Sequence, residues 1–146
     1  GERMAECVGG RWAETDMVAV GLTEPEQGSD ATWMETRAVQ EERDGVDGWL
    51  INGSKMWNTG LHIANYDMIF ARTTGDDGAA RGITCFLVPT DADGFKIEEY
   101  LWTFNMPTDH PRISLTNVWV PDSAILGPRE NGLALAQHFV DRKSVV

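Results

Sequence analysis

The chain is poor in cysteine, histidine and basic residues. Its 146 residues include 2 Cys, 3 His and 12 Lys and Arg against 23 Asp and Glu, for a formal net charge of -11. Cys7 and Cys85 lie far apart and the histidines share no metal-type spacing. Neither a disulfide framework nor a metal site is indicated, and both thiols are expected to be buried. The acidic balance argues against nucleic acid or a membrane surface as a partner, because both are anionic.

The sequence also lacks a long apolar run and a signal-peptide pattern. No stretch approaches the ~20 consecutive apolar residues that span a bilayer, and the N-terminus has no basic region followed by an apolar one. No membrane insertion is indicated, and we expect a cytoplasmic protein. What is present, 42% hydrophobic residues with 6 Trp and 5 Phe, is the composition of a globular domain.

Short extended segments separated by turn signals fill most of the chain. Segments rich in Val, Ile, Thr, Phe and Trp predict strands at 17–22, 32–40, 49–51, 68–72, 83–88, 95–100 and 113–120. The separators are dipeptides suited to hairpin turns: Asp44-Gly45, Asp47-Gly48, Asn52-Gly53, Asp77-Gly78 and Asp93-Gly94. About seven strands without intervening helical patterns predict a mainly β fold, with an antiparallel sheet that is closed or sandwiched.

Helical patterns are confined to the two ends. Residues 3–8 are expected to be the tail of a helix closed by Gly9-Gly10, and 133–140 has helical spacing after a breaker-rich segment. The last six residues, 141–146, match a translated sequencing-adapter read and are a candidate non-native end. We therefore expect the end of a helical region or linker at 1–15, a β domain at 16–128 and the truncated start of a helical domain at 129–146.

The densest group of polar residues lies at 21–30, after an apolar strand. Pro25 fixes φ, Gly28 lets the backbone approach a ligand closely, and Thr23 and Ser29 can donate hydrogen bonds. Such a loop can present N–H groups to a carbonyl or phosphate oxygen. The alternative is an ordinary β-turn in which Ser29 and Asp30 cap local backbone. The segment contains no phosphate-loop, dinucleotide or nucleophile-elbow motif, so those classes are unsupported.

A second candidate, residues 55–60, reads Lys-Met-Trp-Asn-Thr-Gly. The indole of Trp57 could lie along a flat aromatic ligand while Thr59 reaches a heteroatom of that ligand. The alternative is that Trp57 belongs to the core, as a Trp after a hairpin usually does. Two hydroxyl-bearing loops at strand ends of one small barrel can converge on one plane, and this pairing favours a ligand site.

Together, and in this order and spacing, the two segments resemble the middle β-barrel domain of the acyl-CoA dehydrogenase family. Thr23-Glu24-Pro25 followed by Gly28-Ser29-Asp30 is similar to the TEP-x-x-GSD signature. Residues 47–53 with Lys55, Trp57 and Thr59 resemble DG-x-x-ING-x-K-x-W-x-T. Residues 117–121 with Leu126-Gly127 resemble the barrel exit, and 131–139 resembles the first long helix of the C-terminal domain. The resemblance runs from about Val18 onward.

The resemblance implies FAD as the cofactor. Thr23 would bond the flavin ring with the Leu22 backbone at its pyrimidine edge, Trp57 would pack against the ring, and Thr59 would bond N5, the hydride acceptor. Ser29 would lie near the ribityl-pyrophosphate arm and the acyl chain, and so serve substrate as well as cofactor. The implied cofactor-binding set is Leu22, Thr23, Gly28, Ser29, Trp57, Asn58 and Thr59. Val20, Asn58 and Gly60 depart from the residues usual in the family, so the resemblance does not define the substrate pocket.

The implied reaction removes the α-proton of an acyl-CoA thioester with a glutamate while the β-hydride passes to flavin N5, giving the trans-2-enoyl thioester. That glutamate lies on a C-terminal helix in most members, so no catalytic residue is assigned in this chain and Glu24 is not nominated. The chain alone is expected to be inactive. The implied partners are acyl-CoA, an electron-transfer flavoprotein or similar acceptor, and further copies in a homo-oligomer.

Two alternatives remain open at this point, a flavin-dependent oxidase or monooxygenase of the same fold and a non-catalytic β-barrel binding module. Lys55 and Arg72 are candidates for offsetting the charge of an anionic cofactor. His110 is expected in a loop near the substrate entrance and not as a base. The charged runs 41–44 and 91–93 are expected to be solvated turns.

Overall fold

The computed structural model describes residues 16–104 and 109–143 of the chain. The expected helix tail at 3–8, its glycine cap and Cys7 lie outside these residues. The described strands are β1 (Val18–Gly21), β2 (Arg37–Gln40), β3 (Gly48–Met56), β4 (Tyr66–Arg72), β5 (Ile83–Pro89), β6 (Phe95–Tyr100), β7 (Pro111–Pro121) and β8 (Ile125–Leu126). The helices are the 3₁₀ turns η1 (Ala31–Trp33), η2 (Leu61–Ile63) and η3 (Asp122–Ala124) and the α-helix α2 (Gly132–Lys143).

The strands form one sheet in the order β6-β7-β3-β2-β4-β5-β8, with β1 beside β4. Five strand pairs are antiparallel, which confirms the mainly β prediction. The expectation of a wholly antiparallel sheet is wrong at β1–β4 and at the single β2–β4 bridge, both of which are parallel. A parallel pair needs a long connection, and the segment between β1 and β4, which contains β2 and β3, supplies it.

Two local predictions are wrong, one of a strand and one of a hairpin turn. The first half of the strand expected at 32–40 is not a strand: Thr32 and Trp33 lie in η1, and 34–36 have no regular structure. The Asp30 carboxylate accepts hydrogen bonds from the Thr32 amide at 3.1 Å and its hydroxyl at 2.5 Å and so caps a tight turn. Asn52-Gly53 is not a hairpin turn but lies inside β3, where the register against β7 shifts as in a β-bulge. The bulge requires glycine, since a Cβ on Gly53 would lie 2.4 Å from the Thr36 hydroxyl oxygen.

β4 and β5 are buried on both faces and divide the core in two. One cluster, with Ile69, Phe86 and Val118, lies inside the curve of the sheet. The other, with Phe70 and Cys85, lies between β4, β5 and the segments that cover them, η1 and α2. The thiol of Cys85 is buried, which confirms the expectation from the sequence for this cysteine.

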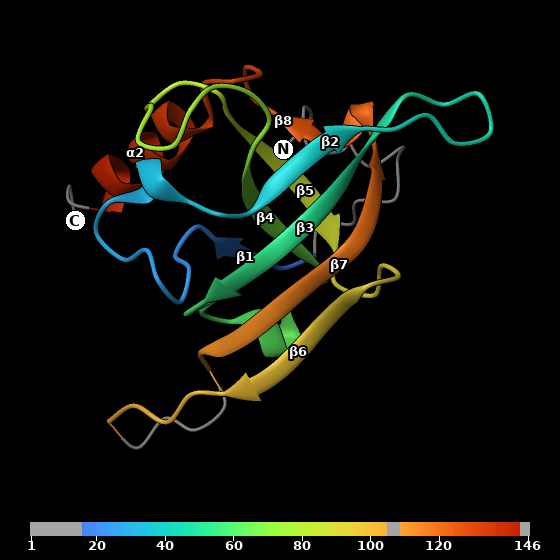
Figure 1. Ribbon diagram of the computed structural model, residues 1–146. Coiled ribbons are helices and arrows are strands. Elements are labelled where there is room, and N and C mark those ends of the chain that lie inside the picture. Colours follow the sequence, from blue (N-terminus) through green and yellow to red (C-terminus); the bar gives the residue numbers. More distant parts are fainter. Residues whose placement is uncertain (1–15, 105–108, 144–146) are drawn as a thin grey trace.

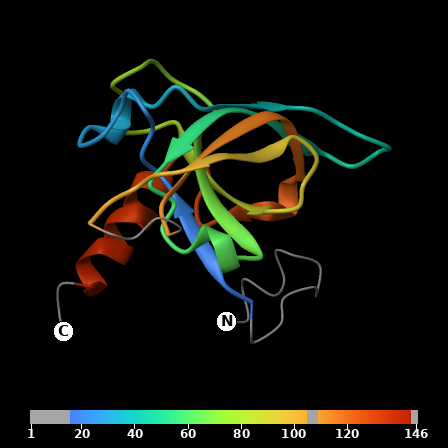
Figure 2. The ribbon, with the colours of Figure 1, turned by 90° about the horizontal axis from the view of Figure 1, so that it is seen from below.

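Figures 1 and 2 show the strongly curved sheet, with α2 packed at one side and the β2–β3 connection projecting from it. The first residue of α2, Gly132, lies against β5. A Cβ added to Gly132 would be only 3.0 Å from the Ile83 carbonyl oxygen. Within the described residues, no helix is long and apolar enough to cross a bilayer.

Candidate functional site

Loop A, residues 22–30, follows β1 and is attached to the end of β3. The Thr23 carbonyl accepts a hydrogen bond from the Met56 amide at 2.8 Å. Glu24 and Gln27 exchange two backbone hydrogen bonds of 3.0 and 3.2 Å across a tight turn that contains Pro25. The ordinary-turn alternative therefore describes the backbone of 24–27 correctly, and Asp30 caps η1 as that alternative expects. Ser29 is exposed, and its hydroxyl has no partner among the described residues.

Loop B, residues 57–60, follows β3 directly. The Trp57 amide donates to the Pro111 carbonyl at 3.0 Å, and the Gly60 amide donates to the Asp109 carbonyl at 3.0 Å. Trp57 has a φ of 67°, a left-handed conformation that is uncommon for a residue with a side chain. With 43% of its surface exposed, Trp57 is not a core residue, and that alternative is wrong.

The two loops lie side by side, as the pairing of the two sequence motifs predicts. Met56, which bonds the Thr23 carbonyl, immediately precedes Trp57. Thr59 is exposed next to Trp57, so the end of β3 presents an indole and a hydroxyl on one part of the surface, beside the backbone of loop A. Flat aromatic and hydrogen-bonding groups placed together suit a planar heteroaromatic ligand.

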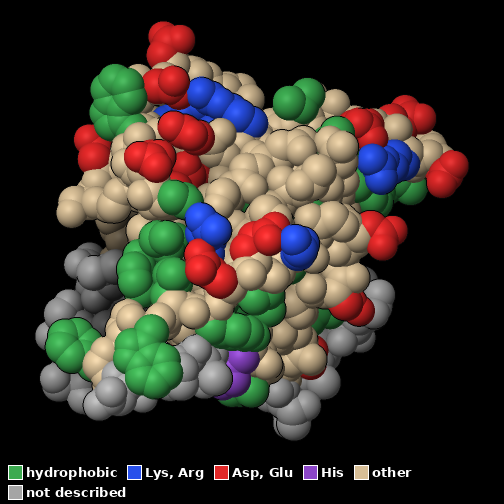
Figure 3. All heavy atoms as spheres, turned by 60° about the horizontal axis from the view of Figure 1, so that its bottom comes forward, with side chains coloured by type: hydrophobic (Ala, Val, Ile, Leu, Met, Phe, Trp, Pro, Cys, Tyr) green, Lys and Arg blue, Asp and Glu red, His purple; other side chains and the backbone are tan. Residues whose placement is uncertain are grey.

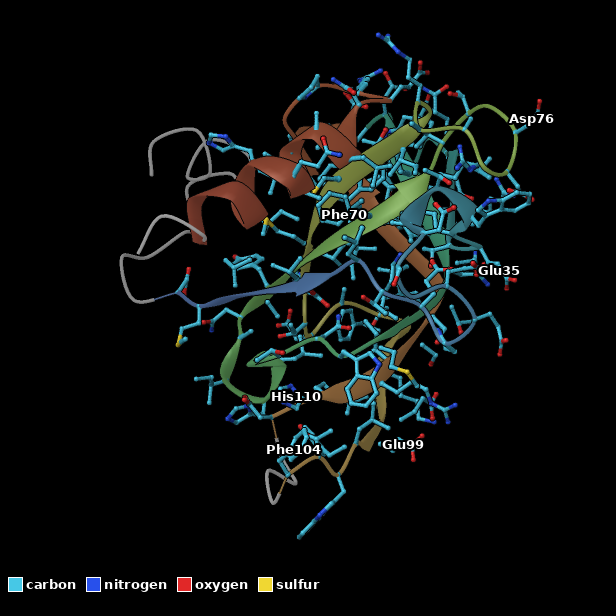
Figure 4. All side chains as sticks on the ribbon, turned by 90° about the vertical axis from the view of Figure 1, so that its left-hand side faces the viewer. Glu35, Phe70, Asp76, Glu99, Phe104 and His110 are labelled. Carbon is cyan, nitrogen blue, oxygen red and sulfur yellow. The ribbon has the colours of Figure 1, made fainter. Side chains whose placement is uncertain are left out.

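A third segment, residues 109–111 before and at the start of β7, borders loop B. The Thr59 hydroxyl oxygen lies 2.9 Å from His110 Nδ1, and the His110 and Trp57 rings meet edge-on with centroids 6.3 Å apart. Figure 4 places His110 and Phe104 at one end of the molecule and Asp76 at the other. The sequence carries no signal for the Thr59–His110 contact, because the two residues are 51 positions apart.

A buried ion pair lies beneath loop A. Lys55 Nζ is 2.8 Å from a Glu24 carboxylate oxygen, and the amides of Glu35 and Thr36 also donate to that carboxylate. Burial opposes ionisation of Glu24, but the Lys55 ammonium and these hydrogen bonds outweigh it and lower the pKa of the carboxyl. Lys55 is fully buried, so the expectation that it offsets the charge of a bound cofactor is wrong.

Arg72 is also structural. Its side chain is 1% exposed, and the guanidinium donates to the backbone carbonyls of Thr74, Arg81, Thr32 and Ala79. These bonds hold the β4–β5 connection against η1. The expectation that Arg72 offsets cofactor charge is wrong for the same reason as for Lys55.

Asn58 points into the molecule while its neighbours Trp57 and Thr59 face outward. Its side-chain amide donates to Asp67 Oδ2, and both side chains are fully buried. Burial raises the pKa of Asp67 to about 7, against the opposing effects of the Asn58 hydrogen bond and the Lys55 charge. Asn58 is thus placed to anchor loop B from below.

Ser29 has a different neighbourhood from Trp57 and Thr59. It lines a groove of about 290 Å³ together with Leu22, Thr32 and, from α2, Leu133 and Ala136. An added Cβ on Gly28 would meet nothing within 4 Å, so the tip of loop A is open to a ligand. Loop A therefore joins two areas, one beside loop B and one beside α2.

Charged side chains of both signs lie on the surface of the molecule. Figure 3 shows acidic and basic side chains intermixed over one face, with large hydrophobic side chains gathered at its lower left. Tyr100, Trp102 and Phe104 are among the exposed large hydrophobic residues. In the described part of the chain, no group of three or more His, Cys, Asp or Glu residues could hold a metal ion. The exposed hydroxyls of Ser29 and Thr59 are among the donors available to an anionic ligand.

Residues 19–118 match the family described as acyl-CoA dehydrogenase, middle domain. The acyl-CoA dehydrogenase FadE34 of Mycobacterium tuberculosis is 36% identical over 116 residues, which are 80% of this chain and 16% of that protein. An acyl-CoA dehydrogenase from Bacillus anthracis, solved in complex with FAD, is 26% identical with a TM-score of 0.71 over 84% of this chain and 20% of that one. The prolyl acyl carrier protein oxidase AnaB is 30% identical with a TM-score of 0.73, over 84% of this chain and 32% of that one.

The chain is short beside these relatives. It spans 16% of the length of FadE34 and 30% of a mitochondrial 2-methylacyl-CoA dehydrogenase from Solanum tuberosum, to which it is 32% identical over 88% of its own length. The similarity therefore concerns one part of those proteins.

Proposed function

The chain belongs to the acyl-CoA dehydrogenase family, and from that premise we propose that residues 16–128 are the flavin-binding domain of an enzyme that oxidises an acyl-CoA thioester to its trans-2-enoyl form. Residues 129–146 would be the truncated start of a helical domain, and 1–15 the end of a helical region or linker. The observation that carries the proposal is the hydrogen-bonded convergence of loops A and B, which exposes Trp57 next to Thr59.

The residues of the two loops fit FAD in chemistry and placement. Trp57 offers an exposed aromatic face to a flat ring and Thr59 offers an exposed hydroxyl beside it, and Thr23 would add a hydroxyl from loop A. Ser29, in the groove against α2, would serve the phosphate-bearing arm of the cofactor and the acyl chain of the substrate. Leu22 and Gly28 would contribute backbone, and Asn58 would hold loop B in place from below. A bound flavin supplies the hydride acceptor, a chemistry that no amino acid side chain provides.

The surroundings of Glu24 argue against this residue as the catalytic base. Glu24, the buried acidic residue of loop A, is 4% exposed and engaged by Lys55 and two backbone amides. A carboxylate held in this way is poorly placed to take a proton from a substrate. The base is expected outside this chain, and the chain alone is expected to be inactive.

The remaining parts of the proposal concern the complete protein. We expect it to work in the cytoplasm as a homo-oligomer, with acyl-CoA as substrate and an electron-transfer flavoprotein or similar protein as acceptor. The relative solved in complex with FAD supports the cofactor assignment.

Replacing Trp57 or Thr59 with alanine in the complete protein tests the site. We expect each substitution to lower the flavin content of the purified protein at least severalfold and to shift the visible absorption of the flavin that remains, because each removes a contact to the ring. Trp102→Ala is the matched control, since Trp102 is 70% exposed and belongs to neither loop. A flavin content and spectrum unchanged by both loop substitutions would favour the non-catalytic binding module.

A second candidate is a flavin-dependent oxidase of the same fold, which the similarity to AnaB favours. The two functions differ in how the reduced protein treats oxygen. A dehydrogenase protects its reduced flavin, so reoxidation in air-saturated buffer should be slow without an electron acceptor protein. Rapid reoxidation with production of hydrogen peroxide would support the oxidase.

A further inference from the structure

His110 is the one imidazole, among the described residues, that contacts a hydroxyl of loop B. Its Nδ1 lies 2.9 Å from the Thr59 hydroxyl oxygen, and its ring meets the edge of Trp57. The second described hydrogen bond of that hydroxyl is a longer one, 3.4 Å, donated to the Trp57 carbonyl. The Thr59 hydroxyl thus has two possible hydrogen-bond partners, His110 Nδ1 and the Trp57 carbonyl.

The backbone on both sides of His110 is fixed. The His110 carbonyl accepts from the Leu101 amide at 2.9 Å, and the Pro111 carbonyl accepts from the Trp57 amide at 3.0 Å. The Asp109 carbonyl accepts from the Gly60 amide at 3.0 Å. Residues 109–111 therefore run along loop B through direct hydrogen bonds, and the imidazole is held against Thr59 by the fold.

A threonine hydroxyl has one proton, and its partner decides where that proton points. An imidazole Nδ1 that carries a proton donates to Thr59 and leaves the hydroxyl proton free for an outside acceptor. An Nδ1 without a proton accepts from Thr59 and leaves the hydroxyl oxygen free for an outside donor. An imidazole can take either role, which a backbone carbonyl cannot.

We propose that His110 is a positioning residue that orients the Thr59 hydroxyl toward the flavin ring, an inference that rests on the function proposed above. The flavin N5 accepts a hydrogen bond in the oxidised ring and donates one in the reduced ring. The Thr59–His110 pair can hydrogen-bond N5 in both states. When Nδ1 donates to Thr59, the hydroxyl can donate to the oxidised ring, and when Nδ1 accepts from Thr59, the hydroxyl oxygen can accept from the reduced ring. His110 thereby acts through Thr59 and not on the substrate.

The direction of the effect follows from the second partner of Thr59. Without the imidazole, the hydroxyl has no Nδ1–H donor, and the Trp57 carbonyl, 3.4 Å away, still competes for its proton, so its donation to an oxidised flavin is weakened while it can still accept from a reduced one. The oxidised state therefore loses more of its hydrogen bonding than the reduced state. The midpoint potential of the bound flavin should therefore become more positive.

Two amide substitutions at His110 test whether a hydrogen-bonding group must lie at the position of Nδ1 or whether any polar side chain at residue 110 is enough. The amide of His110→Asn occupies the region of Nδ1 and can both donate and accept, whereas the amide of His110→Gln reaches the region of Nε2, away from Thr59. In the complete flavin-loaded protein, we expect His110→Gln to favour the reduced flavin about tenfold, about 30 mV for a two-electron couple, and His110→Asn to match the parent. His138→Gln, the same substitution at an exposed position on α2 and away from loop B, is the control and should leave the potential unchanged.

A double-mutant cycle with Thr59→Val shows whether His110 acts through the hydroxyl. If it does, His110→Gln has no further effect on the potential once Thr59 is valine. The proposal is overturned if His110→Gln leaves the potential unchanged, if His110→Asn shifts it equally, or if the two substitutions at 59 and 110 are additive. A complete parent protein that binds no flavin would instead overturn the proposed function.

Discussion

At the scale of single residues, the hydrogen bonding of the Asn58–Asp67 pair beneath loop B depends on whether Asp67 carries a proton. Asn58 Nδ2 donates to Asp67 Oδ2, while the remaining oxygen of each side chain is buried without a described partner. A proton on Asp67 lets the carboxylic acid donate to the amide oxygen, which would complete a cyclic acid–amide pair. Without that proton, two acceptor oxygens stay unsatisfied in the interior.

The free energy of unfolding should depend on this proton. Burial raises the Asp67 pKa from 3.8 to about 7, and Lys55 and Asn58 only partly oppose the shift. Between these values the folded chain keeps a proton that the unfolded chain has lost, so the stabilisation from Asp67 is complete below about pH 4 and is lost as the pH rises through about 7. The other buried titratable group that faces Asp67, Cys85, stays a thiol in this range because burial raises its pKa.

Asp67→Asn is expected to replace the acid–amide pair by an amide–amide pair that needs no proton. The variant should be as stable as the parent near pH 4 and more stable above pH 7, by up to about 4 kcal/mol. Urea unfolding across this pH range measures the difference. Asp91→Asn, which removes one charge at an exposed position, is the control. A difference between Asp67→Asn and the parent that does not change with pH would contradict the account.

At the scale of elements, the Glu24–Lys55 pair fastens loop A to β3. Lys55→Met would leave the Glu24 carboxylate buried among two amide donors with no opposite charge. We expect a loss of about 3–5 kcal/mol in the free energy of unfolding. The double variant Glu24→Gln/Lys55→Met removes both charges and should lose less than Lys55→Met alone.

The matched control for this pair is Lys96→Met, which breaks the exposed pair with Glu98. Exposed pairs contribute less than about 1 kcal/mol, so this variant should unfold at nearly the parental denaturant concentration. Equal losses for Lys55→Met and Lys96→Met, measured by chemical denaturation, would show that burial of the Glu24–Lys55 pair has no energetic consequence.

The elements themselves were largely predictable from the sequence. Val, Ile, Phe and Trp between Asp-Gly turns located most strands, because hydrophobic pattern and turn chemistry act locally. The failures have non-local causes. Asn52-Gly53 is a bulge because β3 continues along β7, and the buried states of Lys55 and Arg72 depend on partners from other segments. The Thr59–His110 and Asn58–Asp67 contacts likewise exist only in the folded sheet.

At the scale of the whole molecule, the net charge of -11 opposes the anionic ligands that the proposed function requires. Two basic side chains that the sequence offered as compensation, Lys55 and Arg72, are buried in the fold. Binding of FAD and acyl-CoA would therefore rest on the hydroxyls and amides of loops A and B and on contacts outside this chain. In this account the chain contributes the flavin site and other parts of the protein contribute the base.

The most direct test is an anaerobic titration of the complete, flavin-loaded protein with acyl-CoA thioesters of different chain lengths. The proposed function predicts that at least one of them bleaches the visible flavin absorbance, since oxidation of the substrate reduces the flavin. Dithionite provides the control that the bound flavin can be reduced. Full bleaching by dithionite with no bleaching by any acyl-CoA would contradict the assignment of the chain to an acyl-CoA dehydrogenase activity.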